Sequence, residues 1–151
     1  MSQTLTLLFT RRKWNPVSWL IRWGVPRSRF ALAMSSHCIV DAGDVLYEAN
    51  MLHGVRAVDR ATALEGQTIV ARIDYTVPDT AAGIAWARSQ IGKPYDWPGA
   101  LGLGLTPYRD WKQDDKFFCY EFGAAVLRAA GRNVFANLTH IGETALMAIN
   151  P

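Results

Sequence analysis

A cysteine in the first turn of a predicted helix is the side chain in this sequence best suited to nucleophilic chemistry. The helix is expected over residues 118–130 and ends at Gly131. Cys119 would lie where unpaired backbone N–H groups and the helix dipole stabilise a thiolate, the reactive form of cysteine. The same residue continues an apolar stripe with Phe122 and Val126 at helical spacing. The pattern therefore leaves a second interpretation open, in which Cys119 is only a core residue.

A predicted β-hairpin supplies the polar groups that could act with this cysteine. The segment "SSHCIVDAGDVLYEAN" (35–50) suits a two-residue turn at 43–44 or at 42–43. Because side chains alternate along a strand, either turn places the same polar side chains on one face, whereas a three-residue turn would not. These side chains are His37, Glu48 and Asn50.

The chemistry expected of this hairpin is that of a positioned histidine. In the 43–44 register His37 pairs with Asn50, and Glu48 lies diagonally opposite; in the 42–43 register Glu48 faces His37 directly. A carboxylate or amide beside an imidazole fixes its tautomer and supports a general base. Each residue alone is more simply explained as an ordinary strand residue. Cys38 alternates to the opposite face and is expected in the core, while His53 and His140 are expected in loops.

Predicted strands and helices must position these groups, and they occur in mixed order along the chain, with several strands in succession near the middle. This order predicts an α+β fold and a single domain over residues 1–151. The segment 93–115, rich in glycine, proline and aromatic residues, is long for a passive connection and is expected to be functional. Strands are expected at 4–10, in the second half of 29–40, and at 44–50, 54–59 and 68–75. Helices are expected at 16–23, 78–92, 118–130 and 139–149.

The charge of the chain is uneven, although its formal total is only +3. The first 40 residues contain no acid, and tryptophans alternate with the basic residues there. This segment is interpreted either as a contact for an anionic polymer or membrane surface or as a solvated basic face; a nucleic-acid partner is not expected. The basic residues are Arg11, Arg12, Lys13, Arg22, Arg27 and Arg29.

The two cysteines and three histidines exclude a recognisable zinc motif or disulfide framework, so neither a metal nor another cofactor is expected. No apolar run approaches the roughly 18 residues of a membrane span. The N-terminal segment also lacks the order of a secretory signal. The protein is therefore expected to be cytoplasmic as synthesised, with delivery to a cell wall or virion by another route.

A set of short motifs resembles a known family. "SSHCIV", "LYEA", "GKPYD" and "FFCYEF" occur in this order over residues 29–131. The order is similar to that of circularly permuted NlpC-type cysteine hydrolases of the YiiX-like kind, in which histidine precedes cysteine. The resemblance implies a papain-like fold, with an antiparallel sheet packed against helices and the cysteine at a helix N-terminus. It also implies a bacterial or phage origin and a substrate among peptidoglycan stem peptides.

Carried over by position, the resemblance makes Cys119 the nucleophile, His37 the general base and Glu48 the orienting residue of a thiol peptidase or amidase. Asn50 is an alternative orienting residue. Tyr95 becomes a site-lining hydroxyl that helps hold the oxyanion. Tyr120 replaces the small residue usual after the cysteine, and is expected to narrow the mouth of the cleft.

Two alternatives stay open at this stage. The apolar segment 100–105 suggests an acyl ester or thioester substrate on the same fold. The basic segment 11–29 suggests a non-catalytic phage or bacterial binding or assembly module with a vestigial site.

Overall fold

A computed structural model describes residues 2–12, 35–100, 115–138 and 141–149. Within these ranges the fold is α+β, built on one five-stranded antiparallel sheet with the strand order β4-β3-β2-β1-β5. The strands are β1 (Gln3–Arg12), β2 (His37–Asp41), β3 (Val45–Asn50), β4 (Gly54–Asp59) and β5 (Gln67–Val77). The helices are α2 (Arg60–Leu64), α3 (Thr80–Ser89), α5 (Cys119–Ala129) and α6 (Glu143–Ala148).

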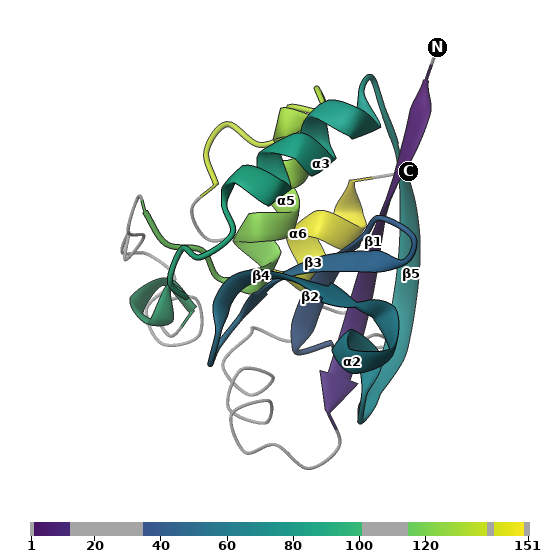
Figure 1. The fold of residues 1–151 in the computed structure, drawn as a ribbon. Helices are drawn as coiled ribbons and strands as arrows, with labels where there is room; N and C mark the ends of the chain where they lie inside the picture. The colour runs from purple at the N-terminus through teal and green to yellow at the C-terminus, as the bar shows by residue number, and fades with distance from the viewer. Residues whose placement is uncertain (1, 13–34, 101–114, 139–140, 150–151) are drawn as a thin grey trace.

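The sheet has apolar side chains on both faces, and the two faces are covered unequally. The larger core lies on the face covered by α3, α5 and α6, which Figure 1 shows together on one side of the sheet. Leu5, Leu7 and Phe9 of β1 belong to this core. A smaller cluster contains Leu8 of β1 and Ala63 of the short helix α2. Successive side chains of β1 point to opposite faces of the sheet and therefore belong to two different apolar clusters.

Two glycines allow helix α5 to pack closely, one against the sheet and one against α3. A Cβ atom at Gly123 would lie 3.0 Å from Cys38 Sγ on β2. A Cβ atom at Gly83 of α3 would lie 2.9 Å from the Cβ of Ala130, just after α5. Nine consecutive residues from Cys119 to Leu127 are buried as a result. This packing places the first turn of α5 beside the strand that begins with His37.

The strands expected from the sequence are confirmed wherever the structure describes them. The hairpin has the 43–44 register: Val40 pairs with Tyr47, and Ile39 pairs with Glu48. Gly43 has φ +94°, which only glycine adopts readily. The strand expected at 68–75 is longer in the structure, as β5.

The helix expected over 78–92 is α3, capped by Asp79, whose carboxylate accepts from Ala82 N at 2.9 Å. The helix expected over 118–130 is confirmed as α5, and α6 occupies the centre of the C-terminal helix expected over 139–149. Two helical segments were not expected: α2, and residues 97–100 inside the segment interpreted as a long loop. The predicted helix at 16–23, the strand residues before 35 and most of 100–105 lie outside the described residues.

Candidate active site

Cys119 is the first residue of α5. The N-cap residue, Phe118, has no side chain that can cap the helix, so the backbone N–H groups of the first turn receive no side-chain cap. These groups and the helix dipole favour a negative charge at this position. Only 2% of Cys119 is exposed. Both sequence interpretations of this cysteine therefore hold in part, since it is at a helix N-terminus and also belongs to the core.

His37 connects Cys119 to Glu48. His37 is the first residue of β2, the strand against which α5 packs, and its side chain is 16% exposed. The imidazole is hydrogen-bonded to Glu48, and it interacts electrostatically with the Cys119 side chain. Nε2 lies 2.5 Å from Glu48 Oε2, which leaves Nδ1 as the nitrogen available to the sulfur. The three predicted catalytic side chains therefore lie together, and His37 interacts with both of the others.

Glu48 is fully buried and is held from three directions. Besides His37, its carboxylate accepts from Arg56 Nε at 2.7 Å and from Asn50 Nδ2 at 3.2 Å. Burial opposes ionisation of Glu48, but the hydrogen bonds and charges of His37 and Arg56 outweigh it and lower its pKa to about 2. Glu48 is therefore a carboxylate at neutral pH. Asn50 acts on Glu48 and not on the imidazole.

The protonation of His37 follows from the same contacts. Burial by itself would lower the pKa of His37, but the hydrogen bonds to Cys119 and Glu48 and the charges of both residues raise it to about 10. The imidazole is therefore an imidazolium at neutral pH, with its Nε2–H donated to the Glu48 carboxylate. A neighbouring imidazolium is one of the groups that favour the thiolate form of a cysteine.

Tyr95 is a second neighbour of Cys119. Its hydroxyl interacts with the side chain and with the backbone N–H of Cys119. Burial raises the pKa of Tyr95 well above its ordinary value, and the charge of Cys119 raises it further, so the phenol keeps its proton and can donate. A parallel bridge between Tyr95 and Phe117 holds it beside the start of α5, with Asp96 N donating to Phe117 O at 3.1 Å.

The turn between β3 and β4 fixes the segment that carries Tyr95. Val55 N donates to Lys93 O at 2.8 Å, and Gly92 N donates to Val55 O at 2.9 Å. Gly54 permits this contact, because a Cβ atom there would lie 2.3 Å from Lys93 O. The motif "GKPY" is therefore attached to the same sheet that carries Glu48.

The role expected for Tyr120 is wrong. The side chain is 2% exposed and does not line the cavity beside His37, so it does not narrow the mouth of a cleft. Its hydroxyl donates to the Ser35 carbonyl oxygen at 3.0 Å and lies 2.9 Å from Ser35 Oγ. The ring also stacks on Phe9, with centroids 6.5 Å apart. Tyr120 therefore anchors the chain just before His37 from within the core.

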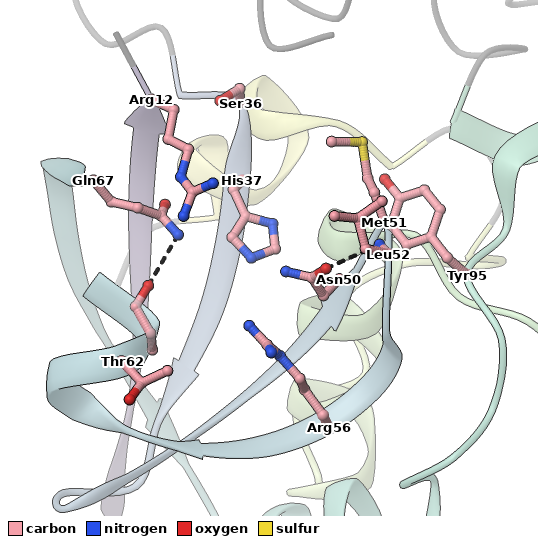
Figure 2. Close-up of a pocket in the computed structure, with 11 residues that line it drawn as sticks. Arg12, Ser36, His37, Asn50, Met51, Leu52, Arg56, Thr62, Gln67 and Tyr95 are labelled. Carbon is pink, nitrogen blue, oxygen red and sulfur yellow. Dashed lines mark hydrogen bonds between the residues drawn. The ribbon is translucent and has the colours of Figure 1, made fainter. Parts of the chain in front are cut away.

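A cavity of about 100 Å³ opens in front of the imidazole (Figure 2). His37 and Tyr95, which interact with Cys119, are part of its wall, whereas Cys119 is not among the lining residues. Figure 2 shows the guanidinium groups of Arg12 and Arg56 pointing toward the space in front of His37. The remaining lining residues are Ser36, Asn50, Met51, Leu52, Thr62, Ala63 and Gln67.

Arg56 is the functional residue that the sequence reasoning missed. It forms an ion pair with Glu48, with Nη2 2.5 Å from Oε1, and it is the direct cross-strand partner of Glu48 in the β3–β4 pairing. A register for this second hairpin, with its turn at Met51–His53, would have placed Arg56 opposite Glu48. The spacing between Glu48 and Arg56 in the sequence was therefore enough to predict that they face each other.

Other residues considered in the sequence lie apart from this cluster or outside the described residues. Cys38 is buried, and burial raises the pKa of its thiol well above the ordinary value. His53 is exposed, and His140 lies outside the described residues, as do Lys13 and Arg22. The described residues contain no group of three side chains suited to hold a metal ion, and none of the described helices is long and apolar enough to span a membrane.

Comparisons of the chain with protein-family models, with curated proteins and with solved structures found no match. Any assignment of function must therefore come from the residues and their geometry.

Proposed function

We propose that this protein is a thiol hydrolase of papain-like, permuted NlpC type, with Cys119 as nucleophile, His37 as acid and base, and Glu48 as the group that orients and charges His37. The observation that supports this most is the position of the His37 imidazole, which is hydrogen-bonded to the buried Glu48 carboxylate and interacts with the Cys119 side chain. A nucleophile, a base and an orienting group in this order define a catalytic triad by geometry.

The reaction proposed is hydrolysis of an amide. The Cys119 thiolate attacks the carbonyl carbon, and the oxyanion that forms is held by the Cys119 backbone N–H and the Tyr95 hydroxyl. The C–N bond then breaks as the imidazolium of His37 gives a proton to the leaving amine. The resulting thioester is hydrolysed when neutral His37 takes a proton from water, which adds to the acyl carbon and releases the sulfur.

The cavity wall has polar and apolar parts, and its polar side chains suit an amide substrate. Most of the lining side chains are polar, and the apolar ones are Met51, Leu52 and Ala63. Peptidoglycan stem peptides fit this requirement, because they are polar chains rich in amide bonds. The apolar segment that motivated an acyl ester lies mostly outside the described residues.

The test is incubation of the purified protein with muropeptides, followed by mass spectrometry of the products. Cys119→Ala should abolish product formation, while Cys38→Ala, which changes the other buried cysteine, should retain it. Equal product formation by the wild type and Cys119→Ala would remove Cys119 from the mechanism. Turnover of short-chain acyl esters with no action on peptides would instead favour the ester substrate.

Alkylation with iodoacetamide separates an enzyme from a binding module with a vestigial site. A functional site predicts that Cys119 reacts at neutral pH and that His37→Ala slows this reaction by about tenfold or more, because the imidazolium that stabilises the thiolate is lost. A Cys119 that stays unmodified until the protein unfolds would support the non-catalytic alternative.

A further inference from the structure

The wall of the cavity carries an excess of positive charge. Three of its side chains are basic at neutral pH: Arg12, Arg56 and the protonated His37. Among the described residues, neither Asp nor Glu lines it. The Glu48 carboxylate is buried, is not among the lining residues, and pairs with His37 and Arg56. Arg12 therefore adds a positive charge that Glu48 does not pair.

Arg12 has N–H donors that are available to a ligand in the cavity. It is exposed at the end of β1, opposite Gln67 of β5, and its Nη2 donates to Glu65 O at 3.3 Å. Within the part of the chain that the structure describes, no Asp or Glu forms an ion pair with it. A guanidinium has five N–H donors in a planar fork that matches a carboxylate. An anion in the cavity can therefore bind Arg12 without breaking an existing ion pair.

The position of Arg12 indicates which part of a substrate it would meet. Figure 2 shows Arg12 and Tyr95 on opposite sides of His37. In the proposed reaction the oxyanion lies beside Tyr95, and the leaving amine must lie beside the imidazole that protonates it. The leaving group therefore extends past His37 toward Arg12.

We infer that Arg12 binds a carboxylate on the leaving group, so the substrate is a peptide or amide whose released amine also carries a carboxylate, such as a terminal amino acid. This inference rests on the proposed function. It names Arg12 as the residue that selects an anionic leaving group, a role that neither the triad nor Tyr95 provides.

The test compares the alkylation of Cys119 by iodoacetate and by iodoacetamide, which differ in one negative charge. The ratio of the two rate constants should fall by about fivefold in Arg12→Gln, an effect expected for one charge at short range near a protein surface. Arg12→Lys should retain most of the wild-type ratio. Arg72→Gln is the matched control, because Arg72 is an exposed arginine on β5 that does not line the cavity, and its ratio should be unchanged.

The outcomes separate the inference from the proposed function. A ratio that is the same in the wild type and in Arg12→Gln overturns the inference and leaves the triad intact. Failure of Cys119 to react with either reagent overturns the proposed function and the inference with it. For muropeptides that the wild type cleaves, amidation of the carboxylate on the leaving side should lower kcat/KM by about tenfold in the wild type and much less in Arg12→Gln.

Discussion

Nε2 of His37 lies 2.5 Å from Oε2 of Glu48, and the Glu48 side chain has no exposed surface. Its other oxygen, Oε1, accepts from Arg56. Two cations therefore converge on one buried anion, and the same imidazolium reaches the nucleophile. Glu48 is the electrostatic centre of the candidate site, because both the charge of His37 and the position of its ring depend on it.

Replacement of Glu48 by glutamine is expected to destabilise the protein and the site together. The change leaves His37 and Arg56 without their carboxylate, and removal of one partner from a buried ion pair costs about 3–5 kcal/mol. Urea unfolding should show this loss. Asp41→Asn is the matched control, because Arg60 in that ion pair is 42% exposed, and its loss should be clearly smaller. Equal losses would show that Glu48 is not held as described.

The stability of the protein should depend on pH through His37. Its pKa is raised from 6.5 to about 10 in the folded protein, so its contribution is fully present below pH 6.5 and is lost as the pH rises toward 10. The difference in unfolding free energy between wild type and His37→Gln, measured by urea titration, should therefore decrease across this range. A constant difference between pH 6.5 and pH 10 would contradict the raised pKa.

The contribution of Glu48 to the stability of the protein should change at acidic pH. Its pKa is lowered from 4.5 to about 2, so its contribution is present above pH 4.5 and is lost as the pH falls toward 2. The difference in unfolding free energy between wild type and Glu48→Gln should shrink in this acidic range. A difference that does not change between pH 4.5 and pH 2 would count against the buried carboxylate.

The hydroxyl of Tyr95 is expected to contribute to catalysis more than to stability. Tyr95→Phe removes one donor to the oxyanion and should lower kcat by about 10²-fold. Tyr75→Phe is the control, because the Tyr75 hydroxyl is also buried but donates to Leu146 O, in the core. That variant should lose stability and keep its kcat. A Tyr95→Phe enzyme with the wild-type kcat would remove Tyr95 from the oxyanion site.

Gly54 is expected to be required for the position of Tyr95. Gly54 and Gly66 have nearly the same backbone conformation, φ +68° and +67°, but only Gly54 lacks room for a Cβ atom. Gly66→Ala should cost about 1 kcal/mol from backbone strain alone. Gly54→Ala should cost more and also slow turnover, because Lys93 must move and Tyr95 follows it. Equal effects of the two substitutions on turnover would contradict this coupling.

The sequence by itself determined most of the strands, the helix that begins at Cys119 and the face shared by His37, Glu48 and Asn50. These follow from local rules: strand alternation, the turn preference of Gly43, and helix spacing. The role of Tyr120 could not be predicted in this way. Its burial depends on Ser35 and Phe9, which are distant in the chain, and no local pattern encodes which neighbours a side chain will meet.

Only the tertiary structure decided whether these groups meet. Cys119 follows His37 by 82 residues, and their contact depends on how α5 packs against β2, with Gly123 setting the distance of approach. Tyr95 reaches the same sulfur because the turn at Gly54 holds its segment against the sheet. Periodicity assigns a residue to a face, whereas the meeting of two faces is fixed by packing between elements, which depends on side-chain volumes throughout the core.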